Sequence, residues 1–395
     1  MNILTVYLTA YGILALSHIL IQMFLAHREH RKQKHPSFVE FHKKHYPSVT
    51  IIVPCYNEKP QIINDCLQAI TEQKYKGKLD TVVIDDGSKN RDELVSVYNK
   101  FGKKENFEII LAPENKGKRE AQKLVFDKYK SEIFVTIDSD TQIENPNGIK
   151  DIVKQFKNPE VGAITGDVRV TNKKKNFLTR LISYRYWTAF NQERAAQSLF
   201  DVLMCCSGPF SAYRRSVIDK VKDKYVSQRF LGHKCTFGDD RHLTNLVLEE
   251  GHKVRFDNRA VAYTYVPENI GEYLKQQVRW NKSFYREMLW TLKSWGKHHF
   301  YMIYDMTLQF FLPFMLVIAL VATLYQAFFV DINRLWLYVV ILIGIALLRA
   351  TYGMLRTRDI GFLTFVVYGF MHILLLIPAR FYALATMGKN GWGTR

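Results

Sequence analysis

Two adjacent acids, Asp239 and Asp240, follow a glycine in the stretch GDDRHLTN at positions 238–245, just before a predicted helix. A single acid at a helix start is commonly an N-cap that accepts hydrogen bonds from helix amides. A second acid beside it is harder to explain structurally, because neighbouring carboxylates repel each other. The pair therefore indicates two roles, in which one acid caps the helix and the other faces a substrate as a general base.

A second acidic pair occurs in DSD, where Asp138 and Asp140 end a β-branched run. In extended chain, side chains two residues apart project to the same side. Paired carboxylates suit a hard divalent cation such as Mg²⁺ or Mn²⁺, held together with substrate phosphates. Surface turns also supply such pairs, but Asp85 and Asp86 end another predicted strand. Together they favour a nucleotide-diphosphate site, with one acid for the nucleoside and two for the metal.

Basic residues surround Gly117 in ENKGKREAQ (114–122), at a predicted helix start. Helix N-termini favour anions, so Lys116, Lys118 and Arg119 are candidates for phosphate contacts. The alternative is a solvated basic turn. The spacing of a Walker P-loop is absent.

The stretch KQQVRWNKSFYRE (275–287) fits a helix on which Gln276, Arg279 and Trp280 share a face. Arg279 can hold diphosphate oxygens through two hydrogen bonds, and the Trp280 indole offers a flat apolar surface on which a sugar ring can stack. The alternative is an amphipathic helix on the membrane surface with its tryptophan at the interface.

The elements that position these residues alternate between strands and helices. Strands are predicted at 49–53, 80–84, 107–111 and 133–137, with helices after Pro60, at 91–101 and from Gly117. This alternation predicts a parallel sheet covered on both faces, whose ligands bind beyond the carboxyl ends of the strands. The acidic clusters follow that rule. Further helices are predicted at 176–199 and 271–295, with strands around 254–265.

Four apolar stretches, at 3–26, 307–330, 335–355 and 362–384, are candidates for the membrane. Basic HREHRKQKHP follows the first, which places the N-terminus outside and residues 27–299 in the cytosol. The predicted domains are a transmembrane helix (1–27), a cytosolic domain (28–298) and a C-terminal membrane region (299–395). We expect the last stretch, which contains Pro378 and Arg380, not to cross, so that the C-terminus faces the cytosol.

The composition limits the partners. The net charge of +18 is explained by anionic lipid headgroups and an anionic substrate, and no nucleic-acid-binding motif accompanies it. The five cysteines show no CxxC spacing, and an odd number on the cytosolic side indicates free thiols.

These motifs, in this order, resemble those of the processive family 2 glycosyltransferases and, more narrowly, of the hyaluronan synthases. The stretches that carry the resemblance run from Pro54 to Arg395: PCYNE, DDGS, NKGKREAQ, DSDT, TRLISYRYWTAFNQERAAQSL, CSGPFSAYRR, GDDRHLTN, YLKQQVRWNKSFYRE and WGTR. Many nucleotide-sugar enzymes share DxD and DDG, whereas QxxRW is specific for processive synthesis. The resemblance implies an α/β fold, with a GT-A (Rossmann-like) cytosolic glycosyltransferase domain and α-helical transmembrane segments.

The resemblance also implies roles for individual residues. Asp240 corresponds to the general base, supported by Asp239. The other implied roles are UDP binding by Tyr56, Glu58, Asp86, Lys118, Trp392 and Arg395; metal binding by Asp138 and Asp140; and acceptor binding by Cys206, Ser207, Gly208, Pro209, Gln276, Arg279 and Trp280.

The implied reaction is an inverting transfer that uses UDP-GlcNAc and UDP-GlcA in alternation, with Mg²⁺ or Mn²⁺, to build hyaluronan. A multi-pass protein of the cell membrane, acting as a monomer among membrane lipids, would extrude the growing polysaccharide. The enzymatic alternative is a synthase of another β-linked polymer: chitin, poly-GlcNAc, or a glucose and glucuronic acid capsule. A subunit without activity is the third possibility, and the intact acidic motifs argue against it.

Overall fold

The computed structural model describes residues 3–35, 46–293 and 295–389. Within those ranges the main sheet has eight strands, in the order β3-β2-β1-β4-β7-β6-β10-β5. One half is parallel and consists of β1 (Val49–Cys55), β2 (Leu79–Asp85), β3 (Phe107–Leu111) and β4 (Ile133–Thr136). These four strands confirm the predicted ones.

The other half makes the sheet mixed. β6 (Val161–Val170) and β10 (Lys253–Thr264) run parallel to each other, whereas β7 (Ser211–Arg214) is antiparallel to both β4 and β6. The short β5 (Thr141–Ile143) pairs antiparallel with the end of β10. The predicted parallel arrangement, which was inferred from the strands at 49–53, 80–84, 107–111 and 133–137, is confirmed for those strands, and the later strands add the antiparallel pairs. A separate two-stranded sheet joins β8 (Arg229–Phe230) to β9 (His233–Lys234).

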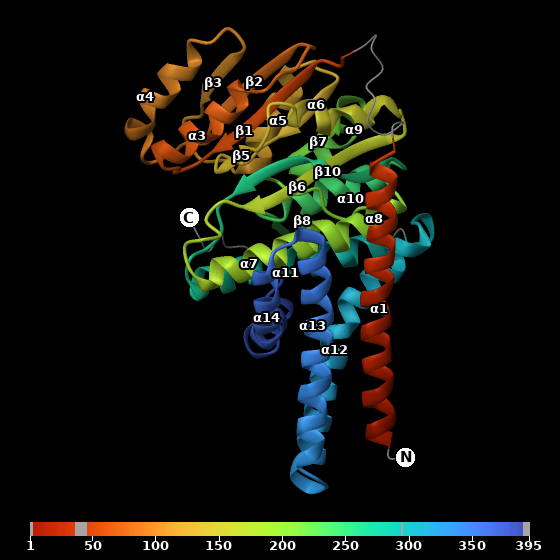
Figure 1. Ribbon diagram of the computed structural model, residues 1–395. Helices are drawn as coiled ribbons and strands as arrows, with labels where there is room; N and C mark the ends of the chain where they lie inside the picture. The colour runs from red at the N-terminus through yellow and green to blue at the C-terminus, as the bar shows by residue number, and fades with distance from the viewer. Residues whose placement is uncertain (1–2, 36–45, 294, 390–395) are drawn as a thin grey trace.

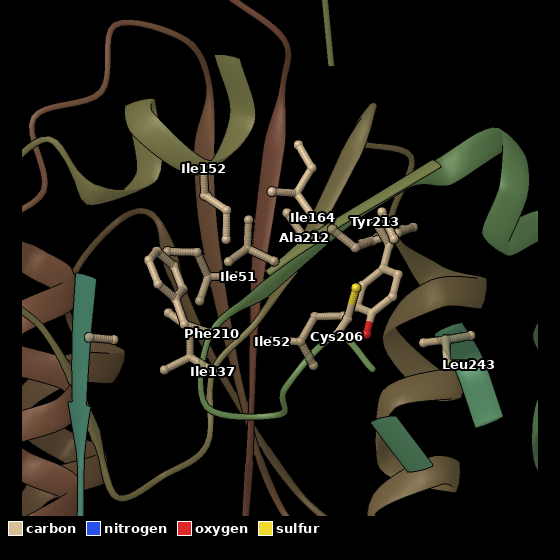
Figure 2. Close-up of a cluster of buried hydrophobic side chains, with 14 of the residues drawn as sticks. Ile51, Ile52, Ile137, Ile152, Ile164, Cys206, Phe210, Ala212, Tyr213 and Leu243 are labelled. Atoms are coloured by element: carbon tan, nitrogen blue, oxygen red, sulfur yellow. The ribbon is translucent and has the colours of Figure 1, made fainter. Parts of the chain in front are cut away.

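The strands are buried because helices cover them (Figure 1). These helices are α3 (Pro60–Thr71), α4 (Arg91–Gly102), α5 (Lys118–Lys128), α6 (Gly148–Val153), a short 3₁₀ turn (Lys154–Lys157), α9 (Arg215–Val226) and α10 (Asp239–Glu249). β1 reads as a continuous apolar run, as expected of a strand covered on both sides. Figure 2 shows its Ile51 and Ile52 in a cluster with Phe210, Tyr213 and Leu243, which joins the sheet to α10.

A layer of helices lies between the sheet and the long apolar helices (Figure 1). It contains α7 (Phe177–Thr188), a π-helical turn (Ala189–Arg194), α8 (Ala195–Leu199) and α11 (Ile270–Leu292). The sequence predicts one helix over 176–199, and the structure interrupts it with the π-turn. Such turns widen the backbone ring, and they are frequent at functional sites.

Within the described ranges, four segments are long and apolar enough to cross a membrane. α1 (Ile3–Gln33), α12 (Phe300–Phe329) and α13 (Asn333–Thr357) extend together away from the sheet (Figure 1). A short 3₁₀ turn (Trp295–Lys297) precedes α12. The fourth segment is broken into a 3₁₀ turn (Ile360–Phe365), α14 (Val366–Met371), a π-turn (His372–Leu376) and α15 (Ile377–Ala385). In Figure 1, α14 lies beside α13, close to the helical layer.

Candidate active site

The GDDRHLTN stretch forms the start of α10, so the structure tests whether Asp239 or Asp240 is an N-cap. Gly238 occupies the cap position with a left-handed backbone (φ 84°), and no side chain caps the helix. Asp239 and Asp240 are the first two helical residues, where the helix dipole favours negative charge. The N-cap interpretation is therefore wrong for both acids.

The structure gives the two acids different surroundings. Asp239 is buried, and its Oδ1 accepts a hydrogen bond from Arg119 Nε at 2.5 Å. The rest of the Arg119 guanidinium donates to the backbone carbonyls of Tyr225 and Phe237 at 3.0 and 3.2 Å. Asp239 is thus fixed in a buried ion pair. Arg119, predicted as a phosphate contact or an exposed turn residue, is neither.

Asp240 faces a group of charged side chains instead. Its Oδ2 accepts the backbone N–H of Gly208 at 2.9 Å, and its Oδ1 lies 3.7 Å from Lys118 Nζ. Burial raises the pKa of Asp240 above its ordinary value, and the charges of Asp138 and Asp239 act in the same direction, whereas Lys118 opposes them. A carboxylate with a raised pKa is a stronger base at neutral pH.

Lys118 joins this acid to the DSD turn. Its Nζ donates to Asp138 Oδ1 at 2.6 Å, and burial, which alone would lower the pKa of Lys118, is outweighed by Asp138, Asp240 and Asp239, which raise it. Lys118 therefore stays a cation. Its positive charge lies close to the carboxylates of both Asp138 in the DSD turn and Asp240 in α10.

Gly208 leaves the space in which these groups meet. A β-carbon at this position would lie 2.7 Å from Lys118 Nζ, 2.9 Å from Asp240 Oδ1 and 3.0 Å from Asp138 Oδ2. The preceding Cys206 is buried, and its N–H donates to Thr244 Oγ1 of α10 at 2.8 Å. The 206–209 loop is thereby tied to α10, and its Gly208 lies against the side chains of Lys118, Asp240 and Asp138.

The DSD carboxylates fit one part of a divalent-cation site. Asp138 is half-buried beside Lys118, and Asp140 Oδ1 accepts a hydrogen bond from Thr264 Oγ1 at the end of β10, at 3.1 Å. Among the described residues, no group of three or more His, Cys, Asp or Glu side chains could hold a metal. Two protein carboxylates suit a cation such as Mg²⁺ that takes its other ligands from substrate phosphates and water.

The predicted nucleotide residues lie at the ends of β1 and β2. Both oxygens of Asp86 accept backbone N–H groups, from Lys116 at 2.9 Å and Gly117 at 2.8 Å, so this acid shapes the loop before α5. Glu58 is buried, and its Oε2 accepts from Ser139 Oγ of the DSD turn at 3.0 Å. Tyr56 is half-buried near these ends. The structure thus brings these residues to one sheet edge.

α11 carries the remaining predicted residues. Trp280 is 42% exposed, and its ring lies 6.3 Å from that of Tyr186 in α7. Burial raises the pKa of Tyr186, as do the charges of Asp140 and Asp138, whereas Arg279 lowers it. Tyr186 therefore lies beside the Trp280 ring of α11, where the charges of the DSD turn act on it.

Three further residues were predicted to bind the acceptor or the nucleotide: Gln276, Trp392 and Arg395. Gln276 is half-buried, with its Oε1 unpartnered in the described part of the chain. Trp392 and Arg395 lie outside the described residues.

Sequence reasoning missed several residues of this site. Arg119 was recognised as basic, but nothing in the sequence indicated its pairing with Asp239. Thr264 reaches Asp140 from a strand more than a hundred positions away, and Tyr186 lies in a segment noted only as a motif. Tyr186 could have been found by comparing the faces of the two predicted helices at 176–199 and 275–287.

A mixed sheet with acidic strand ends, a DxD turn and a second acidic motif on a neighbouring helix defines a glycosyltransferase of the GT-A fold. Residues 50–222 match the glycosyl transferase family 2 domain. The fold is also similar to that of the mannosyltransferase PcManGT from Pyrobaculum calidifontis in complex with GDP-Man and Mn²⁺. The TM-score is 0.62 at 22% identity, over 93% of this chain and 99% of that one.

Relatives cover most of the chain. An N-acetylglucosaminyltransferase of Mesorhizobium japonicum is 38% identical over 351 residues, which are 89% of this chain and 82% of the relative. One from Rhizobium sp. (strain N33) is 37% identical over 350 residues, 89% and 77% of the two chains, and one from Neorhizobium galegae is 34% identical over 387 residues, 98% and 88%. The chain belongs to the family 2 glycosyltransferases.

Proposed function

We propose that this protein is a membrane-integrated inverting glycosyltransferase that transfers N-acetylglucosamine from UDP-GlcNAc to the end of a growing β-linked chain. One observation carries the proposal: Asp240, with a raised pKa, faces Asp138 and Lys118 across the space that Gly208 leaves open. The candidate base Asp240 and the candidate diphosphate-binding residues Asp138 and Lys118 are thus close enough for one bound sugar to contact both.

The donor assignment rests on the relatives. Those named above are N-acetylglucosaminyltransferases, which favours UDP-GlcNAc and a product of the chitin or chitooligosaccharide type. Hyaluronan, which needs UDP-GlcA as well, is the second candidate. It is favoured by the stretches GDDRHLTN and WNKSFYRE. Both candidates share the transfer of N-acetylglucosamine.

The mechanism follows from the positions of the charges. Asp240 removes the proton from the acceptor hydroxyl, whose oxygen then bonds to the anomeric carbon from the side opposite the diphosphate. The bond from that carbon to the diphosphate oxygen breaks, and the α-linked donor becomes a β-linkage and UDP. Lys118 and Arg279 stabilise the negative charge that develops on the leaving diphosphate. Asp138 and Asp140 would hold a Mg²⁺ or Mn²⁺ ion, which adds positive charge at the same place.

The acceptor side is assigned to the 206–209 loop and to the α11 face. The exposed Trp280 ring offers a stacking surface for the terminal sugar, and Tyr186 stands beside it. Gln276 is placed one helical turn before Trp280, where its amide can bind sugar hydroxyls.

The proposed membrane arrangement has α1, α12 and α13 crossing and the segment Ile360–Ala385 not crossing. Two contacts support this, because they tie both ends of that segment to the glycosyltransferase domain. Asp359 pairs with Lys173 at 2.7 Å, and Lys389 O accepts from Lys282 Nζ of α11 at 3.3 Å. The C-terminus then lies on the same side of the membrane as the active site.

The test uses purified protein in liposomes with Mg²⁺ or Mn²⁺, and either UDP-GlcNAc, UDP-GlcA or both. We expect radiolabelled N-acetylglucosamine to enter a chitinase-sensitive product from UDP-GlcNAc alone, and no product to form with the Asp240→Asn variant. A lyase-sensitive polymer that requires both donors would establish the hyaluronan alternative. Failure to transfer N-acetylglucosamine under any of these conditions contradicts the proposal.

A further inference from the structure

A buried polar cluster joins α10 to α11. Its centre is Glu287 of α11, which is 3% exposed. The carboxylate accepts hydrogen bonds from Gln228 Nε2 at 2.5 Å and Asn245 Nδ2 at 2.9 Å, and it lies 3.2 Å from His242 Nδ1. His242 and Asn245 are both on α10, so one carboxylate holds two successive turns of that helix.

The contacts of the His242 ring show how closely this cluster is packed. The ring is completely buried, stacks on Tyr225 at 6.4 Å and meets the edge of Trp290 at 5.3 Å. Its Nε2 has no partner in the described part of the chain. The contact with Glu287 is thus the only hydrogen bond between this ring and another side chain among the described residues.

The same two helices are in register nearer the site. A β-carbon on Gly238, the residue before the acid pair, would lie 2.2 Å from Ser283 Oγ of α11. Gly238 meets Ser283, and His242 and Asn245 meet Glu287, so α10 and α11 advance side by side in the same direction. A sliding or rotation of α10 along α11 would therefore move Asp240 relative to Trp280.

We propose that Glu287 is a positioning residue for glycosyl transfer, because it fixes the register of the helix that carries Asp240 against the helix that carries the acceptor-binding face. The inference rests on the proposed function. It adds to that function a residue that touches neither donor nor acceptor.

A purely structural role explains the cluster less well. A buried ionisable group is costly to desolvate, and replacement of such groups by apolar residues is often neutral or stabilising. Directional hydrogen bonds fix one register between two helices, whereas an apolar contact between them tolerates sliding. The cluster lies between the two helices whose relative position sets the geometry of transfer.

The experiment compares Glu287→Gln with Asp201→Asn. The carboxamide keeps the size of the side chain, but its NH₂ group replaces one of the two accepting oxygens and so meets the NH₂ donor of either Gln228 or Asn245. Asp201 is a matched control, because its carboxylate pairs with Arg255 Nε at 2.5 Å and Nη2 at 3.1 Å, outside the α10–α11 contact. Transfer to a GlcNAc-oligosaccharide acceptor, hydrolysis of UDP-GlcNAc by water, UDP affinity and thermal unfolding are measured for each.

For Glu287→Gln we expect transfer to fall by about 10- to 100-fold, as displacement of a catalytic group by about 1 Å does. Hydrolysis should fall less, so that the ratio of transfer to hydrolysis drops, while UDP affinity stays within about twofold of the wild type. Asp201→Asn should lower the unfolding temperature and leave that ratio unchanged.

An unchanged ratio in Glu287→Gln, or a parallel loss of UDP affinity, overturns the inference. Should Glu287→Gln fail to fold, Asn245→Ala, which removes one of the hydrogen bonds, is judged by the same criteria. A wild-type protein that transfers no N-acetylglucosamine contradicts the proposed function. A wild-type protein that transfers it, with a variant of unchanged ratio, contradicts only the inference about Glu287.

Discussion

Asp239 and Asp240 are adjacent, yet their surroundings predict opposite effects when each is changed to asparagine. Asp240→Asn should abolish transfer and leave stability nearly unchanged, because it removes a carboxylate that repels Asp138 and Asp239. Asp239→Asn should destabilise the fold, because it leaves the buried guanidinium of Arg119 without its counter-charge. Both substitutions keep the size of the side chain, so each effect reports on charge.

The magnitudes follow from the contacts. A positioned general base contributes about 10²- to 10⁴-fold to the rate, and Asp240→Asn should lose that factor. At 2.5 Å the Arg119–Asp239 pair has a gross Coulomb energy of roughly 7 kcal/mol at an effective dielectric constant of about 20. The net loss on breaking a buried pair is about 3–5 kcal/mol, which corresponds to a fall in unfolding temperature on the order of 10 °C.

Release of UDP from UDP-GlcNAc with acceptor measures the first effect, and tryptophan fluorescence during heating measures the second. Activity is expressed per folded protein, so that loss of fold is not read as loss of catalysis. The reasoning is refuted if Asp239→Asn unfolds at the wild-type temperature, or if Asp240→Asn transfers sugar at a rate within about tenfold of the wild type.

Three further outcomes can be checked. Chelation with EDTA should stop transfer and added Mg²⁺ or Mn²⁺ should restore it, while asparagine at Asp138 or Asp140 raises the metal concentration needed for half-maximal rate. Gly208→Ala should cut transfer by about 100-fold without loss of stability, because the site is crowded there and the glycine has no left-handed backbone. Burial alone would raise the pKa of Asp85, but hydrogen bonds led by Arg91 hold it below its ordinary value. Asp85→Asn should therefore lower the free energy of unfolding by about 1–3 kcal/mol at neutral pH. The stabilisation from a lowered pKa is full above the carboxyl's unfolded pKa, so that difference should begin to shrink as the pH falls below about 4 and vanish only below the lowered pKa of the folded state.

The sequence predicted the parts of the fold that rest on local pattern. β1 to β4 are short runs rich in β-branched residues, and polar residues follow β1, β2 and β4, so these strands can be recognised without a structure. The same holds for α11, whose predicted start and end lie within three residues of the observed ones. β7 and β5, by contrast, are four and three residues long, and they owe their conformation to pairing with strands that are distant in sequence: β7 lies between β4 and β6, and β5 pairs with the end of β10.

The site was predictable in its residue types and less so in its pairings. The acidic and basic residues near strand ends and helix starts were recognised as candidate site residues. Which cation pairs with which carboxylate, however, depends on how α5, α9 and α10 pack. Arg119 and Lys118 are neighbours in sequence, and successive residues on a helix point in different directions. Arg119 therefore reaches the buried Asp239, whereas Lys118 reaches Asp138 and Asp240. That division could not be read from KGKR alone.

The membrane region also takes part in building the site, because α11 is bonded to it along its length. Near the start of α11, the hydroxyl of Tyr273 meets that of Tyr368 in α14 at 2.8 Å. Farther on, Arg380 of α15 donates to the Tyr285 hydroxyl at 3.2 Å and to the carbonyl of Gln309 in α12 at 2.7 Å. The helix that carries the proposed acceptor face is therefore held both by the apolar C-terminal segments and by α10. The proposed nucleotide residues lie on loops at the sheet edge, whereas the proposed acceptor face depends on contacts with the apolar C-terminal helices and with α10.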